Sequence, residues 1–212
     1  MAKPQKSKTP LGAADPRNLC KIKICVSGAA ETGDCAKDAL EKSKAIGREI
    51  VRQAAVLVTG ATTGAPYWAA IGAKEAGGIS IGLSPASTER EHVERYGLPT
   101  DYFDIIIYTG FDYSGRNLLL TRSSDGVIIV CGRIGTLNEF TIAFEDHKPI
   151  GVLSGSGQTA DLIKTIVETA KREHVPIIYD DDPKRLVRRL VEIVCETKGN
   201  HRGGEAYFRG RG

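Results

Sequence analysis

Short apolar segments alternate with amphipathic ones along most of the chain. Continuous apolar runs occur at residues 21–27, 55–60, 79–85, 104–110, 125–131, 149–155 and 176–180. Such unbroken runs are typical of strands buried on both faces of a parallel sheet. Helical periodicity or helix-end signals mark residues 35–53, 65–76, 88–96, 115–124, 137–147, 159–173 and 183–196. The alternation predicts an α/β fold, a three-layer, doubly wound, Rossmann-like sheet that is mostly parallel and has about seven strands.

The two ends of the chain differ from its middle. Residues 1–18 are polar with Pro and Lys, which predicts a disordered basic tail. Residues 199–212 carry Arg-Gly pairs and predict a second disordered tail. These pairs resemble RNA-binding segments, although a solubilising tail has the same composition. A single Rossmann-like nucleotide-binding domain is expected over residues 19–198, since a chain of 212 residues suffices for one sizeable α/β domain.

Charge and hydropathy exclude several classes of partner. The net charge is +3, and the tails hold an excess of the basic residues, so no basic stripe marks the middle of the chain. A nucleic-acid partner is therefore not expected. Apolar runs fall well short of the roughly 20 residues that span a bilayer, so no membrane partner is expected either. The N-terminus lacks an apolar signal core, and we expect a cytoplasmic protein.

The cysteines suggest neither a disulfide framework nor a metal site. There are five, an odd number, and no CxxC pair occurs: Cys20, Cys25, Cys35, Cys131 and Cys195. Structural zinc sites and small disulfide-rich folds use paired, closely spaced cysteines. Cys25 and Cys131 lie in or beside apolar runs and are expected to be buried free thiols. We expect a reduced protein with no bound metal and no resident cofactor.

The loops that follow the strands carry the candidate chemistry. In a doubly wound sheet, ligands bind outside the carboxyl ends of the strands. Five of the six loops after the first six predicted strands combine Gly with Ser or Thr. One such loop is an ordinary helix cap, but five at one edge favour a nucleotide or sugar-phosphate pocket. No Walker motif and no good GxGxxG fingerprint occurs, which disfavours a conventional NAD site.

Two charged residues border the fifth predicted strand. Glu139 lies one turn into the helix that starts at Gly135 and Thr136, and Arg116 begins the preceding helix. Each has a plainer interpretation. Thr136 and Glu139 fit a capping box, in which both only satisfy backbone amides. Arg116 could be a solvated surface arginine. Arg122 and Arg133 also lie near this edge and are candidate phosphate ligands.

The segment "CGRIGTLNE", residues 131–139, resembles the "PGGxGTxxE" signature of the LONELY GUY family, long mislabelled as lysine decarboxylases. Gly132, Gly135, Thr136 and Glu139 match the signature. Arg116 lies nine residues before Asp125, which reproduces the spacing of the family's upstream arginine. Residues 56–85 look like the second glycine loop of the family with its helix and next strand. The resemblance covers about residues 21–194.

The chain departs from the family pattern at four positions. Cys131 replaces the proline, Arg133 the second glycine, Asn117 a lysine and Asn138 a frequent glutamate. These changes are more similar to a branch of Rossmann nucleotide-binding proteins that is related to molybdenum cofactor carriers. The departures affect the expected substrate more than the expected fold.

The resemblance implies a nucleoside 5′-monophosphate phosphoribohydrolase, which cleaves the N-glycosidic bond to release a base and ribose 5-phosphate. Glu139 would then hold the ribose, activate water and stabilise the oxocarbenium-like charge, while Arg116 would orient an AMP-like substrate. The expected binding residues are Ser27, Gly28, Gly60, Thr62, Thr63, Gly64, Arg122, Gly132, Arg133, Gly135 and Thr136. The alternative is a non-catalytic nucleotide or cofactor carrier. Decarboxylation of lysine is excluded, because no Lys lies in a candidate loop to bind pyridoxal phosphate.

The resemblance also implies a homodimer or a higher homo-oligomer. Aromatic residues on the helices after the second and fifth predicted strands could belong to the core or to such an interface: Tyr67, Trp68, Phe140 and Phe144. The core is the default assignment for any one of them, because a single surface aromatic is common.

Overall fold

The computed structural model describes residues 21–172 and 175–202. Its centre is a seven-stranded sheet in which every pair of neighbouring strands is parallel. The strands are β1 (Lys23–Gly28), β2 (Val56–Thr59), β3 (Ser80–Ser84), β4 (Ile105–Tyr108), β5 (Gly126–Val130), β6 (Ile150–Leu153) and β7 (Ile177–Asp180). Each predicted apolar run overlaps one of these strands, and only β1 extends beyond its run, by one residue. The predicted α/β fold and its seven strands are therefore confirmed.

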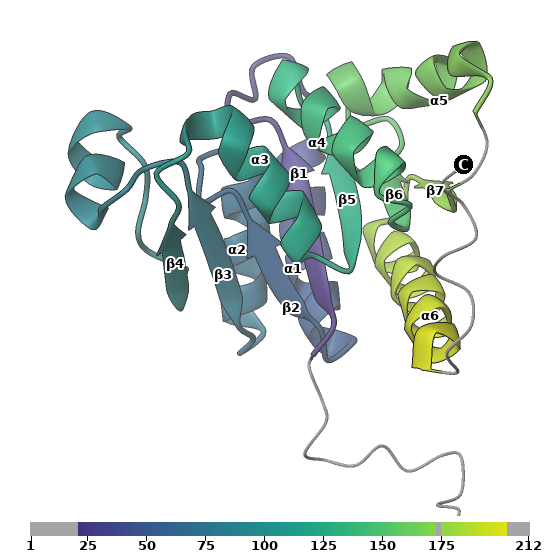
Figure 1. Cartoon of the computed structure of the whole chain (residues 1–212), viewed down its shortest axis with the longest axis horizontal. Coiled ribbons are helices and arrows are strands. Elements are labelled where there is room, and N and C mark those ends of the chain that lie inside the picture. The colour runs from purple at the N-terminus through teal and green to yellow at the C-terminus, as the bar shows by residue number, and fades with distance from the viewer. Residues whose placement is uncertain (1–20, 173–174, 203–212) are drawn as a thin grey trace, which may run out of the picture.

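Helices follow the strands and cover both faces of the sheet (Figure 1). One face carries α1 (Ala39–Arg52), α2 (Ala65–Glu75) and α6 (Pro183–Arg202). The opposite face carries α3 (Asp112–Ser123), α4 (Ile134–Glu145) and α5 (Gln158–Ala170). A five-residue π-helix, η2 (Glu91–Arg95), lies between β3 and β4, within the predicted helical segment 88–96. The result is the predicted three-layer, doubly wound arrangement.

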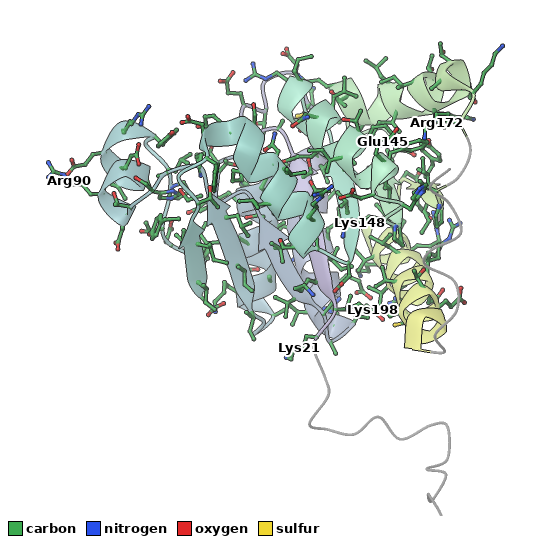
Figure 2. The ribbon with its side chains drawn as sticks, viewed as in Figure 1. Lys21, Arg90, Glu145, Lys148, Arg172 and Lys198 are labelled. Carbon is green, nitrogen blue, oxygen red and sulfur yellow. A yellow bond between two sulfur atoms is a disulfide. The ribbon has the colours of Figure 1, made fainter. Side chains whose placement is uncertain are left out.

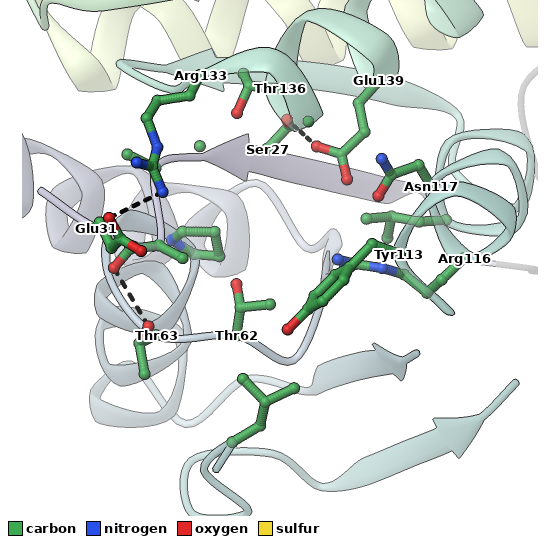
Figure 3. Close-up of a pocket in the computed structure, with 18 of the residues that line it drawn as sticks. Ser27, Glu31, Thr62, Thr63, Tyr113, Arg116, Asn117, Arg133, Thr136 and Glu139 are labelled. Atoms are coloured by element: carbon green, nitrogen blue, oxygen red, sulfur yellow. Dashed lines mark hydrogen bonds and ion pairs between the residues drawn. The ribbon is translucent and has the colours of Figure 1, made fainter. Parts of the chain in front are cut away.

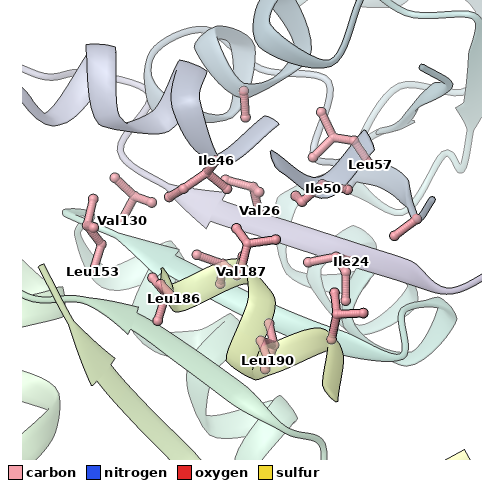
Figure 4. Packing of buried hydrophobic residues seen from close by; sticks show 14 of the residues in the cluster. Ile24, Val26, Ile46, Ile50, Leu57, Val130, Leu153, Leu186, Val187 and Leu190 are labelled. Atoms are coloured by element: carbon pink, nitrogen blue, oxygen red, sulfur yellow. The ribbon is translucent and has the colours of Figure 1, made fainter. Parts of the chain in front are cut away.

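Each face of the sheet has its own apolar core. Ile46 of α1 and Leu186 of α6 pack over the central strands on one face (Figure 4). Leu120 of α3 and Phe140 of α4 pack on the other face. Phe140 is therefore a core residue. Three other aromatic side chains that we weighed as core or interface are only half-buried: Tyr67, Trp68 and Phe144.

The strand order creates a crevice at the centre of the sheet. The order is β4-β3-β2-β1-β5-β6-β7, so the chain first winds outward from β1 to β4 and then returns to β5 beside β1. The loops after β1 and β5 consequently lead away in opposite directions. Ligands of doubly wound proteins bind at this kind of switch point.

An ion-pair cluster closes the opposite end of the central strands. Nζ of Lys23 on β1 and Nζ of Lys198 on α6 lie 3.0 and 2.9 Å from Asp125 Oδ2; Figure 2 shows Lys198 at the far end of α6. Burial alone would raise the pKa of Asp125, but hydrogen bonds from Lys198 and Lys23 lower it below its ordinary value. The aspartate that opens β5 thus anchors α6 to the sheet.

Several helix ends differ from the predicted ones. α3 begins at Asp112 and α4 at Ile134, each three residues earlier than expected. α6 continues to Arg202, so residues 199–202, which we expected in the C-terminal tail, are helical. The rest of the two predicted tails and Cys20 lie outside the described residues, which exclude 1–20 and 203–212.

The cysteines contradict part of the prediction. Cys35 and Cys131 form a disulfide bond, with their Cα atoms 5.7 Å apart. The expectation that no disulfide would form, and that Cys131 would be a free thiol, was wrong. The two residues are 96 positions apart in the sequence, and they meet because β1 and β5, which precede their loops, are paired in the sheet. Cys25 is a buried free thiol, as predicted, and Cys195 is free and exposed.

Candidate functional site

A cavity of about 470 Å³ lies at the carboxyl ends of β1, β2 and β5 (Figure 3). This volume is within the usual range for a small-molecule site. Its walls come from the loop after β1, the loop after β2, the first turns of α3 and α4, and residues 96–98 between η2 and β4. Ten of the predicted site residues line it: Ser27, Gly28, Gly60, Thr62, Thr63, Arg116, Arg133, Gly135, Thr136 and Glu139.

Glu139 is a buried pocket residue. It lies in the second turn of α4 and is only 6 % exposed. Ser27 Oγ, at the end of β1, donates a hydrogen bond to Glu139 Oε2. In the amide orientation that satisfies its neighbours, Asn117 Nδ2 donates to Glu139 Oε1 at 2.9 Å. The capping-box interpretation was wrong, because α4 begins at Ile134 and no side chain caps it.

The surroundings of Glu139 favour its protonated form. Burial raises the pKa of this carboxyl group, while the positive charge of Arg116 and the hydrogen bond from Ser27 act in the opposite direction. The net shift is upward. Carboxyl groups with a raised pKa and a cavity beside them are candidates for proton transfer.

Arg116 is a buried cation at the wall of the cavity. It is 5 % exposed, so the surface-arginine interpretation was wrong. Among the described residues, no carboxylate lies within ion-pair distance of its guanidinium, and its buried Nε has no hydrogen-bond partner. The guanidinium lies beside the ring of Tyr113, at 5.8 Å from the ring centroid. An unpaired, desolvated cation at a cavity wall is well suited to bind an anion.

Gly60 makes room for this guanidinium. A Cβ atom at Gly60 would collide with Nη1 of Arg116, so no larger residue fits while Arg116 keeps its position. Gly135 differs, because a Cβ atom there would meet no atom within 4 Å. Gly60 and Gly135 therefore have different roles. Gly60 supports the cation, and Gly135 keeps the N-terminus of α4 accessible from the cavity.

Three predicted site residues do not line the cavity. Arg122 lies at the end of α3, near the amino ends of the strands, where its Nε pairs with Asp146 Oδ2 at 3.0 Å. The prediction that Arg122 binds phosphate was wrong, because α3 runs antiparallel to the strands and its last turn points away from their carboxyl ends. Gly64 and Gly132 have φ angles of +71° and +97° and shape the turns behind the wall.

Arg133 pairs with an acidic residue across the mouth of the cavity. Its Nη2 lies 2.9 Å from Glu31 Oε2 on the loop after β1, and both side chains are exposed (Figure 3). The pair therefore joins the same two loops as the Cys35–Cys131 disulfide. An arginine at this position, where the LONELY GUY signature has glycine, adds a charged contact at the entrance of the cavity.

Several pocket residues were not predicted. Tyr113 and Asn117 come from the first turns of α3, one turn before and one residue after Arg116. Their spacing from Arg116 was the signal that could have identified them. Tyr96 lies edge-to-face with Tyr113, with the ring centroids 5.6 Å apart. Glu31 lies on the loop after β1, and this position at the expected ligand edge was the signal that could have identified it. Tyr96 lies between η2 and β4, and no sequence signal indicated that this segment reaches the cavity.

The loop after β6 supports the site from behind and does not line the cavity. Ser156 Oγ accepts a hydrogen bond from the backbone N–H of Cys131 at 2.8 Å. The carbonyl oxygen of Ser156 accepts one from the N–H of Ala36 at 3.0 Å. This glycine-containing loop, which we expected at the ligand edge, thus connects the two cysteine-bearing loops.

Two further kinds of feature are absent from the described segments. No group of three or more His, Cys, Asp or Glu residues there could hold a metal ion. No helix there is both long and apolar enough to cross a membrane.

With this geometry, comparison with known proteins is informative. The family model of the SLOG cluster4 family matches residues 21–187, which is most of the chain. The protein belongs to the SLOG cluster4 family. The resemblance to LONELY GUY proteins holds at the level of this Rossmann-like fold. An uncharacterized protein of Archaeoglobus fulgidus is 29 % identical over 132 residues, which cover 62 % of this chain and 82 % of that one.

Two solved structures resemble this SLOG cluster4 protein closely. One is the molybdenum cofactor binding protein of Rippkaea orientalis, with 28 % identity, a TM-score of 0.68 and coverage of 83 % of this chain and 99 % of that one. The other is the molybdenum cofactor carrier protein of Chlamydomonas reinhardtii, with 27 % identity, a TM-score of 0.66 and the same coverage.

Proposed function

We propose that this SLOG cluster4 protein binds an anionic organic ligand of nucleotide size and carries it without turnover. The observation that supports this most strongly is the buried, unpaired guanidinium of Arg116 at the cavity wall. A cation in that position is costly unless an anion joins it. The two similar structures are named as molybdenum cofactor binding and carrier proteins, which favours a phosphorylated cofactor as cargo.

The residues around the cavity fit such a ligand. A phosphate group would bind Arg116 and the N-terminal turn of α4 at Gly135 and Thr136, where free amides and the helix dipole favour negative charge. A flat ring system would pack against the exposed ring of Tyr113. Glu139 would complete the contact by hydrogen bonding to a hydroxyl or ring N–H group of the ligand. The chain would thus bind, orient and shield the cargo.

Phosphoribohydrolase activity is the second candidate, and the environment of Glu139 favours it. In its ionised form Glu139, which is hydrogen-bonded to Ser27, could take a proton from water as the water oxygen attacks C1′ of a nucleoside monophosphate, and its raised pKa would make it a stronger base. The N-glycosidic bond would break, the base would leave with its bonding electrons and take up the proton that Glu139 removed from water, and ribose 5-phosphate would remain. Arg116 would hold the phosphorylated sugar.

One experiment separates the two candidates. The purified protein is incubated with AMP, and free adenine is measured by chromatography over several hours, with the variant Glu139→Ala as a parallel sample. The carrier proposal expects no adenine above the level of the variant. Adenine release that depends on Glu139 would support the hydrolase instead.

We also propose that the chain forms a homodimer through apolar residues at the β4 edge of the sheet and on α3. β4 is an edge strand, and its Ile105 and Ile107 side chains are about half exposed. Leu118 and Leu119 are exposed on α3. Large apolar side chains that are exposed to solvent on an edge strand and on a surface helix are candidates for a protein interface.

The disulfide bond removes one of the reasons for which we expected a cytoplasmic protein. That expectation rested partly on free thiols, whereas Cys35 and Cys131 form a disulfide bond. Disulfides of cytosolic proteins are usually transient and redox-sensing. A cytoplasmic protein with this bond would therefore be expected to cycle between its oxidised and reduced forms.

A further inference from the structure

The disulfide joins two walls of the cavity. Cys35 lies on the loop after β1, four residues beyond Glu31, and Cys131 opens the loop after β5, immediately before Gly132 and Arg133. Glu31 and Arg133 both line the cavity. The covalent bond therefore connects the two segments that enclose the cavity on either side of the switch point.

Cys131 also has a backbone conformation that is unusual for its residue type. Its φ angle is +54°, in the left-handed region, and the next residue, Gly132, has a φ angle of +97°. Together these two residues turn the chain from β5 into α4, whose first turn lines the cavity. A non-glycine residue held in this region costs on the order of 1 kcal/mol or more and persists only when its surroundings enforce it. The bond to Cys35 is one such constraint.

The other described contacts between the two loops are an exposed ion pair and indirect bridges through Ser156 and through Gln158, whose Nε2 donates to Asp34 Oδ2 at 3.3 Å. Ser156 accepts hydrogen bonds from the backbone N–H groups of Ala36 and Cys131, and thus bridges the loops indirectly. The direct Arg133–Glu31 ion pair is exposed, and exposed pairs contribute little. Breaking the disulfide would therefore loosen the loops without unfolding the core, which is built from other residues.

We propose that the Cys35–Cys131 pair is a redox switch for the cavity. The disulfide holds the two loops in the arrangement that forms the binding site, and reduction to two thiols releases them and weakens ligand binding. The predicted loss of ligand affinity on reduction rests on the proposed ligand-binding function. The predicted release of the two loops on reduction is independent of that function.

The reducing partner is a dithiol, which reduces the Cys35–Cys131 disulfide by thiol–disulfide exchange. Cys35 is partly exposed and Cys131 is fully buried, so a thiolate of the dithiol attacks Sγ of Cys35. A mixed disulfide forms on Cys35, the old S–S bond breaks, and Cys131 leaves as a thiolate that takes a proton. The second thiol of the reductant then attacks the mixed disulfide and frees the Cys35 thiol. Two electrons and two protons pass to the protein, and the dithiol becomes a disulfide.

Hydrogen–deuterium exchange on the full chain tests the switch. The oxidised protein is compared with the same protein after dithiothreitol treatment, and free thiols are counted in both samples. We expect exchange in peptides covering residues 29–38 and 131–136 to rise about tenfold on reduction, while peptides of β2 stay unchanged. Cys35→Ser should match the reduced protein without any reductant, and Cys195→Ser, at a free exposed cysteine, should match the oxidised wild type. Unchanged loop exchange, or no additional thiols after reduction, would overturn the proposal.

Calorimetric titration with AMP on the same samples tests the consequence for binding. We expect Kd to be about tenfold higher for the reduced protein. Equal affinity in both samples would overturn redox control of the cavity. If AMP binds neither sample, the proposed nucleotide-type ligand is contradicted, and the exchange result alone then decides whether the disulfide orders the loops.

Discussion

Ser27 Oγ donates a hydrogen bond to Glu139 Oε2, and this contact joins the end of β1 to the second turn of α4. The two residues are 112 positions apart in the sequence. They meet because β1 and β5 are neighbours at the centre of the sheet, and α4 follows β5 directly. The contact places a buried carboxyl group in the wall of the cavity that Arg116 also lines, and the positive charge of Arg116 acts on the Glu139 pKa.

Arg116 and Arg122 form a matched pair on one helix. Arg116→Ala removes the buried cation at the cavity, and we expect at least a tenfold loss of affinity for an anionic ligand, since one charge-assisted hydrogen bond contributes roughly 1.5–3 kcal/mol. Arg122→Ala removes only an exposed ion pair with Asp146, and we expect less than a twofold change. Titration calorimetry with AMP measures both. Equal effects of the two substitutions would exclude Arg116 as the anion site.

Gly60 and Gly135 allow a similar comparison. Gly60→Ala places a methyl group where the Arg116 guanidinium lies, so we expect a loss of roughly 1–3 kcal/mol in the free energy of unfolding as the side chain is displaced. Gly135→Ala meets open space in the first turn of α4, and we expect stability to fall by no more than about 0.5 kcal/mol or to rise. Urea unfolding of both variants measures the difference. A neutral Gly60→Ala would mean that Arg116 does not occupy this position.

Glu139 should make stability depend on pH. Its folded pKa is raised, mainly by burial, so in the window above its ordinary pKa the native protein retains a proton that the unfolded chain has lost. The stabilising contribution is therefore complete below the ordinary pKa and is lost as pH rises through the folded value. We expect Glu139→Gln to be more stable than wild type at neutral pH and to lose this part of the pH dependence.

Urea midpoints from pH 4 to pH 8 measure this effect. Glu41→Gln, at an exposed position on α1, is the control and should parallel wild type throughout. If Glu139→Gln also runs parallel to wild type over the whole range, the upward shift of the Glu139 pKa is not present in solution.

Much of this fold could be predicted from sequence because its signals are local. The residues "GVIIV" of β5 are all buried. A strand that is buried on both faces has a continuously apolar sequence, so it can be recognised from sequence. The predicted topology was enough to indicate that a ligand would bind at the carboxyl ends of the strands. Arg116 and Glu139 were identified as candidates because both lie within one turn of a predicted loop at that edge. The capping box and the Arg122 assignment were wrong because spacing gives no information on which way a helical side chain faces.

The disulfide could not be predicted for a different reason. Cys35 and Cys131 lie on separate loops, and their approach depends on the β1–β5 pairing and on the support of the loop after β6. Tyr96 escaped prediction in the same way, because it reaches the cavity from the segment between η2 and β4. Contacts of this kind depend on the exact path of loops, which a pattern of apolar and polar residues does not determine.

The apolar residues on β4 and α3 give a test of self-association. We expect wild type to be a dimer in light scattering, and Ile107→Lys or Leu118→Glu to be a monomer, because each places a charge among exposed apolar side chains. Far-ultraviolet circular dichroism confirms that the variants remain folded. Val93→Lys, on η2, is a matched substitution of an exposed apolar residue and should remain dimeric. A monomeric wild type would contradict the interface.

The most direct test of ligand binding at Arg116 is mass spectrometry of the small molecules released when freshly purified protein is denatured. Wild type and Arg116→Ala are prepared in parallel, and circular dichroism confirms that both are folded. We expect wild type to release a phosphorylated organic molecule at a stoichiometry well above that of the variant. Equal amounts from both proteins, or no organic anion from wild type together with no AMP binding in titration, would contradict the proposed carrier function.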